Sequence, residues 1–221
     1  MISVSQVKKT FGRLVALDGV TLELRLGERV AFVGTNGSGK TTLLRSILGL
    51  VRVEGRISID GVDVAREPEV ALRSVAYVPQ IAPPIEAPVR EVVRAHAAIR
   101  GLDLARIEER AARLGLDLRA SHGKRFRDLS GGMKQKLLAA MALATEAPVL
   151  ICDEPTANLD GEARASFVEQ LAERQNGLLI LCSHRLEEVQ RLVNRVIEMK
   201  DGRVQRDFAI ADRSPRSVRS A

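Results

Sequence analysis

The stretch "GTNGSGKTT", residues 34–42, decides the fold. It fits the pattern G-x-x-x-x-G-K-[ST] through Gly34, Gly39, Lys40 and Thr41, in which glycines let backbone N–H groups curl around phosphate oxygens. The preceding "GERVAFV" is typical of a buried strand, and residues 41–50 have helical spacing. A helix N-terminus attracts anions, so we predict a phosphate-binding loop between a strand and a helix.

Each position of this loop has a predicted task. Lys40 is expected to reach the β- and γ-phosphates, and the Thr41 hydroxyl is expected to hold Mg²⁺. The other loop positions assigned to nucleotide binding are Asn36, Gly37, Ser38 and Thr42. The alternative is a glycine-rich turn without a ligand, and the strand and helix pattern on both sides disfavours it.

A second candidate group follows the apolar run of "VLICDEP", residues 149–155. Asp153 and Glu154 stand at the carboxyl end of this predicted strand, where ligands bind in open α/β sheets. We expect Asp153 to hold Mg²⁺ through water and Glu154 to polarise the attacking water as a general base. The alternative, a strand that ends in two solvated acids, is disfavoured beside a phosphate-binding loop.

Composition narrows the class of protein. The chain of 221 residues has a net charge of +6 and a pI of about 9.8, with Lys and Arg scattered among Asp and Glu. This indicates a solvated mixed-charge surface, with nearness to an anionic membrane as the alternative. Aromatic residues make up 3% of the chain, which argues against a stacking platform for single-stranded nucleic acid.

Localisation and redox state follow from the same kind of observation. No apolar run approaches the roughly 18 residues that span a bilayer, and the N-terminal residues lack the apolar stretch of a secretory signal. We therefore expect the chain to stay inside the cell. Cys152 and Cys182 lie in apolar runs and match no metal spacing, so we interpret both as small buried residues.

The order of predicted elements indicates one domain over residues 1–208 with a basic, disordered tail over 209–221. Alternating residues predict antiparallel strands at 2–9 and 20–26, and "EGRISIDGVDV" predicts two short strands around Asp60-Gly61. The proline-rich "PQIAPPIEAP" is an extended connector. It leads into a helical subdomain at about 88–128. The later elements are expected as helices at 132–146, 161–174 and 185–193 and strands at 148–154, 177–183 and 195–204.

The stretch "LSGGMKQK", residues 129–136, looks like a second phosphate-binding loop. With it, the chain resembles the ATP-binding-cassette (ABC) ATPases. The phosphate loop, "YVPQ", "LSGGMKQK", "VLICDEPTANLD" and "CSH" occur in that family's order from about Ile2 to Phe208. The resemblance implies a P-loop NTPase fold of the α/β class. A RecA-like parallel sheet core carries an antiparallel β subdomain and an inserted α-helical subdomain.

The resemblance also explains why the chain has two such loops. In this family two nucleotide domains pack head to tail, and the "LSGG" of one closes over the ATP of the other. It implies that Ser130, Gly131 and Gly132 contact the γ-phosphate in trans. Asp160 is expected at the dimer seam.

Further roles come from the resemblance. Gln80 is expected to sense Mg²⁺ and the attacking water, and His184 to bond the γ-phosphate. Phe11 aligns with the aromatic residue that stacks on adenine, and a place in the local core is its alternative. His96 and His122 match no motif, so we expect both to be structural or solvated.

The stretch "LSGGMKQK" corresponds to the signature motif of the family, and it departs from the common pattern at two positions. Met133 stands where Gln is frequent, and Lys136 stands where Arg is frequent. A Met at position 133 resembles the branch of the family that is rich in exporters with separate membrane subunits. This resemblance favours export as the direction of transport. Lys136 lacks the planar fork of an arginine.

The resemblance implies an ATP-hydrolysing transporter subunit with ATP and Mg²⁺ as cofactors. A transmembrane permease is expected to dock on the helical subdomain, with Ile81–Arg90 forming part of the groove. We expect a second nucleotide-binding subunit, normally an identical copy, and no nucleic acid. The expected location is the cytoplasmic face of the inner membrane. The alternatives are a soluble ABC-type ATPase acting on nucleic acid or ribosomes, and a non-catalytic regulatory cassette.

Overall fold

The computed structural model describes residues 1–174, 176–183 and 190–210. His184 lies outside the described residues, and so do most of the helix expected at 185–193 and of the tail expected at 209–221. Among the described residues, no helix combines the length and the apolar character that a membrane crossing requires.

A six-stranded sheet forms the centre of the molecule, with strand order β10-β9-β3-β8-β7-β6. Five of its strands run parallel, and β10 pairs antiparallel with β9. Their apolar runs are buried on both faces, as expected of parallel strands covered on two sides. The strands are β3 (Arg29–Val33), β6 (Val75–Val78), β7 (Val149–Asp153), β8 (Leu178–Cys182), β9 (Arg195–Lys200) and β10 (Arg203–Ala209).

A second sheet of four antiparallel strands has the order β2-β1-β4-β5. It comprises β1 (Ile2–Phe11), β2 (Leu14–Leu24), β4 (Glu54–Ile59) and β5 (Val62–Asp63). One face of this sheet shares a hydrophobic core with helix α1 (Lys40–Ile47) and with one face of the central sheet. The alternating pattern of the N-terminal residues has its cause in this half-buried arrangement.

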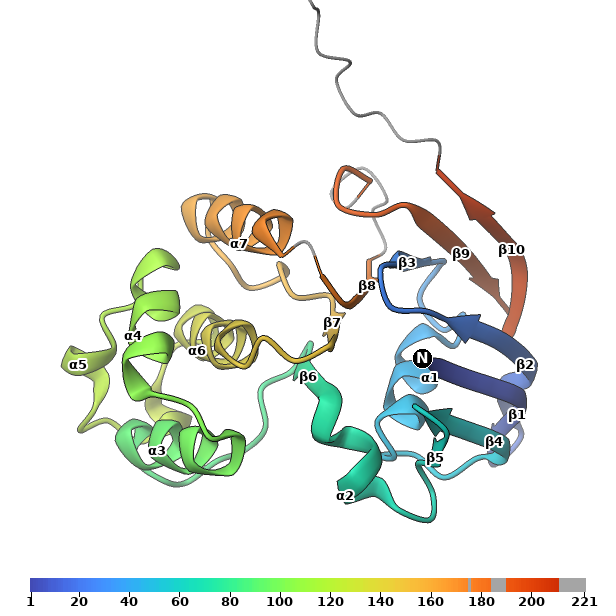
Figure 1. The fold of residues 1–221 in the computed structure, drawn as a ribbon, viewed down its shortest axis with the longest axis horizontal. Coiled ribbons are helices and arrows are strands. Elements are labelled where there is room, and N and C mark those ends of the chain that lie inside the picture. The colour runs from blue at the N-terminus through green and yellow to red at the C-terminus, as the bar shows by residue number, and fades with distance from the viewer. Residues whose placement is uncertain (175, 184–189, 211–221) are drawn as a thin grey trace, which may run out of the picture.

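The helices α3 to α7 cover the opposite face of the central sheet (Figure 1). The buried α6 (Gly131–Ala144) lies between that sheet and an outer group of helices. The outer group and its neighbours are α3 (Val89–Arg100), α4 (Leu104–Arg113), α5 (Leu118–Ser121), η2 (Phe126–Asp128) and α7 (Gly161–Glu173). Two short helices, α2 (Pro68–Ala71) and η1 (Leu72–Ser74), lead into β6. The predicted fold class is confirmed.

Side-chain caps start four of these helices. Asp103, Asp117, Ser130 and Asp160 accept hydrogen bonds from the first turns of α4, α5, α6 and α7. Such caps satisfy N–H groups that have no partner inside the helix. The signature serine therefore has a local structural task before any ligand is considered.

One predicted element is wrong. The strand expected at 195–204 is a hairpin of β9 and β10 that turns at Asp201 and Gly202. Both residues have positive φ, 49° and 75°, which an Asp-Gly pair adopts readily in a two-residue hairpin turn. Residues 190–192, within the helix expected at 185–193, form a turn. The expected domain end at 208 lies one residue before the end of β10.

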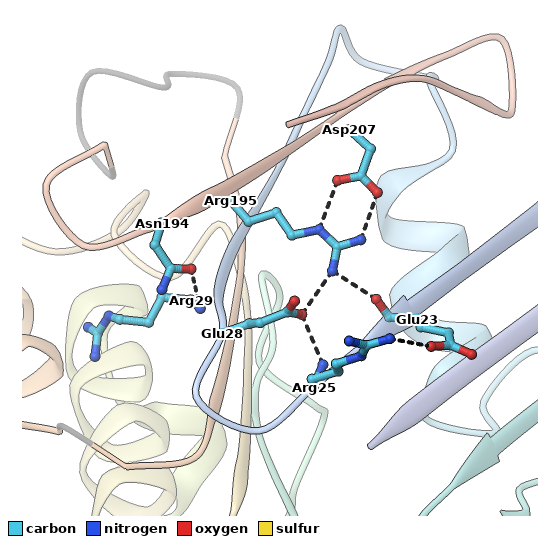
Figure 2. Close-up of polar contacts among 7 residues, drawn as sticks. All are labelled: Glu23, Arg25, Glu28, Arg29, Asn194, Arg195 and Asp207. Atoms are coloured by element: carbon cyan, nitrogen blue, oxygen red, sulfur yellow. Dashed lines mark hydrogen bonds and ion pairs between the residues drawn. The ribbon is translucent and has the colours of Figure 1, made fainter. Parts of the chain in front are cut away.

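Arg195 at the start of β9 ties the two sheets together (Figure 2). Its guanidinium donates to both carboxylate oxygens of Asp207 at 2.8 and 2.7 Å. It also donates to Glu28 Oε2 and to the Glu23 carbonyl, each at 2.8 Å. Glu28 in turn accepts from the Arg25 backbone N–H at 2.9 Å. One cation thus joins β10, the end of β2 and the β2–β3 connection.

Replacing Arg195 by Met should lower the free energy of unfolding by about 1–2 kcal/mol. The loss leaves the partly buried Glu28 carboxylate and the exposed Asp207 carboxylate without their shared cation. The matched control is Arg206→Met, because Arg206 makes only a 3.8 Å ion pair with Glu198 on the exposed face. Urea unfolding of the two variants checks this, and equal losses would contradict a joining role for Arg195.

Candidate functional site

A cavity of about 460 Å³ opens at the carboxyl edge of the central sheet. Its lining comes from segments far apart in the sequence: the β1–β2 hairpin, the loop after β3, the start of α1, Gln80 beyond β6 and Glu154 after β7. The lining residues are Phe11, Leu14, Ala16, Asn36, Gly37, Ser38, Gly39, Lys40, Thr41, Thr42, Gln80 and Glu154. Ten of the predicted site residues therefore share one cavity.

The Lys40 side chain folds back onto the phosphate loop and bonds groups of that loop. Lys40 Nζ donates to the carbonyls of Gly34 at 2.7 Å and Thr35 at 3.0 Å and to Ser38 Oγ at 3.3 Å. Gly39 precedes α1 with φ of 103°, and a Cβ there would lie 2.6 Å from the Ala16 carbonyl. Both this backbone angle and this close approach require a glycine at position 39.

Asp153 lies beneath the loop. Thr41 Oγ1 donates to Asp153 Oδ1 at 3.2 Å, which joins residues 112 positions apart. Asp153 is fully buried, and its Oδ2 has no hydrogen-bond partner among the residues that the structure describes. Burial raises the pKa of the Asp153 carboxyl above its ordinary value, although the Thr41 hydrogen bond opposes this shift. A buried acceptor without a partner is costly, so the site is suited to a cationic ligand.

Glu154 follows Asp153 with φ of 46°, in the left-handed region that non-glycine residues avoid. Its backbone N–H donates to the Cys182 carbonyl at 3.1 Å. Its side chain meets Gln80, whose Nε2 donates to Glu154 Oε2 at 3.1 Å. Strained backbone of this kind persists where the surroundings hold it, and here it accompanies a carboxylate on the cavity wall.

The outer wall of the cavity is apolar. Phe11 and Leu14 are both exposed at the β1–β2 turn, and Lys9 Nζ lies 4.9 Å from the centroid of the Phe11 ring. The alternative that Phe11 belongs to the local core is therefore wrong. An exposed ring beside a phosphate loop is suited to stack on a flat base. Sequence analysis did not single out Leu14, whose only signal is its place beside Phe11.

The signature residues do not reach this cavity. Ser130 and Gly131 are exposed at the N-terminus of α6, where Ser130 Oγ accepts from the Met133 N–H at 3.2 Å. Asp160 caps α7, and its second carboxylate oxygen pairs with Lys136 at 2.8 Å. The second loop and Asp160 are thus bound to each other through α6 but are separate from the lining of the phosphate cavity.

The remaining histidines and cysteines lie away from the cavity lining. His96 Nε2 bonds the Met141 carbonyl at 3.2 Å, which links α3 to α6 and agrees with a structural task. His122 is partly exposed at the end of α5. Cys152 and Cys182 are free and fully buried, and burial raises the pKa of both thiols, as the sequence analysis expected of buried cysteines.

Gln135 is a residue of the site that the sequence motifs did not indicate. This residue is buried on α6, and its side chain donates to two backbone carbonyls beside Gln80 and Glu154. Its position inside the quoted "LSGGMKQK" was the only available signal, and nothing in the sequence shows which groups it meets.

Residues 17–157 match the family model described as ABC transporter. The chain is 34% identical to the Nod factor export ATP-binding protein I of Paraburkholderia xenovorans, over 91% of this chain and 68% of that protein. It is 36% identical to a sulfate/thiosulfate import ATP-binding protein of Nocardia farcinica, over 93% of this chain and 64% of that protein.

The chain thus spans about two thirds of the length of these two relatives. A solved structure of an ATP-binding cassette is also similar. It is a dimer in a post-hydrolysis state with ADP and Pi, and it matches with a TM-score of 0.81 and 26% identity over 96% of this chain and 100% of that one.

Replacing Asp153 by Asn should raise the melting temperature of the nucleotide-free chain by about 2–4 °C, equivalent to about 1 kcal/mol. The raised folded-state pKa means that the ionised carboxylate opposes folding at pH 7, so removing its charge stabilises the chain. The same variant should lose the extra stabilisation that Mg²⁺ adds to ATP.

Differential scanning fluorimetry with ATP, in Mg²⁺ or in EDTA, measures both effects. The control is Asp128→Asn, which removes an exposed carboxylate and should change neither quantity. A lower melting temperature with an intact response to Mg²⁺ would contradict the assignment of Asp153.

Proposed function

The chain belongs to the ABC transporter family as an ATP-hydrolysing ATP-binding protein, and on this premise we propose that it drives a separate membrane-embedded transport partner. The observation that carries the proposal is the split site. The phosphate loop and Glu154 line one cavity, while the exposed Ser130 and Gly131 lie elsewhere on the same chain. A second copy packed head to tail would bring its Ser130, Gly131 and Gly132 over this cavity.

The described residues fit ATP. Residues 36–39 of the loop and the N-terminus of α1 line the cavity, and a helix N-terminus favours phosphate. Lys40 would exchange its loop carbonyls for the β- and γ-phosphate oxygens. The exposed Phe11 ring would stack on adenine, with Leu14 beside it.

The described residues also fit Mg²⁺, because the buried Oδ2 of Asp153 has no partner of its own. Thr41, Asp153 and Gln80 would hold the ion, directly or through water. When bound, Mg²⁺ offsets the negative charge that develops on the phosphate oxygens.

Hydrolysis then uses groups that the cavity already orients. Glu154 would accept a proton from a water molecule whose oxygen attacks the γ-phosphorus as the bond to ADP breaks. Gln80 holds the Glu154 carboxylate at 3.1 Å and would keep it aimed at that water. His184 would bond the γ-phosphate, and this residue lies outside the described part of the chain.

We place the protein at the cytoplasmic face of the inner membrane, held there by its partner. For the direction of transport we propose export, on the single feature of Met133 in the signature. The two relatives are named for export and for import, so the partner defines the cargo.

The variant Glu154→Gln should bind ATP and hydrolyse it only at a slow residual rate, because the amide cannot accept the proton. With ATP it should elute from size exclusion as a dimer, and a second change, Lys40→Met, should abolish that dimer by removing the phosphate contact. Light scattering on the eluted peak gives the mass directly. A monomer in saturating ATP would contradict head-to-tail closure.

The same tagged variant, purified from solubilised membranes with ATP, identifies the partner by mass spectrometry. A stoichiometric integral membrane protein supports the transporter. Ribosomes or nucleic acid in its place would support the soluble-ATPase alternative and contradict our proposal.

The connector Ile81–Arg90 is the segment we propose for partner docking. Ile81 is 72% exposed, while Glu86 pairs with Arg127 at 2.5 Å and Val89 N–H donates to the Lys124 carbonyl at 2.9 Å. The segment is thus fixed along the helical region and still presents an apolar side chain.

Replacing Ile81 by Asp should reduce ATPase stimulation by the reconstituted partner at least fivefold and leave the basal rate within about twofold, since only docking is disturbed. Leu26→Asp is the matched control, because Leu26 is an exposed apolar residue at the β2–β3 connection, 56% exposed. Loss of nucleotide binding in the Ile81 variant would instead mark the connector as structural.

A further inference from the structure

Gln135 occupies an unusual position between two strand ends. It is 2% exposed on α6, and its Nε2 donates to the Pro79 carbonyl at 3.1 Å and to the Pro155 carbonyl at 3.2 Å. An amide NH₂ has two hydrogens, so these two acceptors satisfy it completely. The two prolines are the residues directly before Gln80 and directly after Glu154.

The sheet itself cannot hold these two segments together. The parallel pairing of β6 with β7 runs from Val75–Val149 to Val78–Cys152 and ends there. Proline has no N–H, so neither Pro79 nor Pro155 can donate a further ladder hydrogen bond. Gln135 therefore joins the two backbones just beyond the point where the sheet stops joining them.

The same two backbones carry the pair on the cavity wall. Gln80 Nε2 donates to Glu154 Oε2 at 3.1 Å. The Pro79 carbonyl that Gln135 holds is bonded directly to Gln80, and the Pro155 carbonyl belongs to the residue that follows Glu154. A change in the position of Gln135 would change the distance between Gln80 and Glu154. Proton transfer is sensitive to displacements of this kind.

Two neighbours of Gln135 fasten the following segment to α6. A Cβ on Gly132 would lie 3.1 Å from the Asn158 carbonyl, and Lys136 Nζ lies 2.8 Å from Asp160 Oδ2. Positions 132, 135 and 136 share one helix face through their i, i+3 and i+4 spacing. The N-terminal half of α6 thus bonds this segment at Pro155 and Asp160 and lies close to it at Asn158.

We propose that Gln135 is a positioning residue that sets the Gln80–Glu154 pair and couples it to the placement of α6. This inference rests on the proposed function, in which the N-terminus of α6 contacts the nucleotide held by a second copy. Docking of α6 on that nucleotide then adjusts the general base of its own chain, so each site reports its occupancy to the other.

The variant Gln135→Met keeps the side-chain length and removes both donors. We expect kcat for ATP hydrolysis to fall at least tenfold, with KM and the Kd for a fluorescent ATP analogue within about twofold, because none of the Gln135 contacts is made with the nucleotide. Steady-state kinetics, a binding titration and the melting temperature are measured together.

Gln170→Met is the matched control. Gln170 is also 2% exposed on a helix, α7, and bonds Ser166 Oγ and Arg110 at 3.3 and 3.4 Å, away from the cavity lining. We expect a similar loss of melting temperature and an unchanged kcat. If in both variants the loss of kcat is proportional to the loss of melting temperature, Gln135 only fills space and the proposal is wrong.

A double variant separates positioning from a general weakening of the domain. The rates to compare are the single-turnover hydrolysis rates of the Glu154→Gln variant and of the double variant that also carries Gln135→Met. If Gln135 acts through Glu154, the two rates should differ by less than twofold. A further tenfold loss would overturn the proposal. A parent chain that binds ATP but never hydrolyses it would instead contradict the proposed function, which keeps the two failures distinguishable.

Discussion

Five parallel strands end at one edge of the central sheet, and this constraint positions the polar groups of the site. The phosphate loop follows β3, Gln80 follows β6, Asp153 ends β7 and Glu154 follows it. The strand β8 lies between β3 and β7, yet the Thr41–Asp153 hydrogen bond spans that gap below the loop. Because parallel strands all point the same way, distant parts of the chain meet at the edge without any special contact being needed.

The groups at this edge are held in states that are unfavourable without a ligand. Asp153 is buried with one oxygen unpartnered, and Glu154 adopts a left-handed backbone conformation. Lys40 meanwhile bonds carbonyls of its own loop. Such local costs are tolerated because the two hydrophobic cores on either face of the sheet hold the strands in place. A ligand that supplies a cation and phosphate oxygens would relieve the first of these costs and give Lys40 new partners.

The helix α6 connects this edge to the rest of the molecule. It is buried along most of its length, so it moves only with its neighbours, while its N-terminus with Ser130 remains exposed. Gln135 and Lys136 attach the same helix to the segment that follows Glu154. An exposed end and an internal attachment on one rigid element are what a mechanical link between two sites requires.

The sequence by itself determined the phosphate loop, the paired acids after an apolar strand and the α/β class, because each depends on residues adjacent in the chain. A loop that wraps phosphate needs its glycines and lysine in one continuous stretch, so the whole pattern can be seen in the sequence. Only the tertiary structure decided that Gln135 bridges two strand ends, that Lys136 pairs with Asp160 and that residues 195–209 form a hairpin. These contacts join residues that meet only after packing. The spacing of neighbouring residues in the sequence does not show which residues will meet.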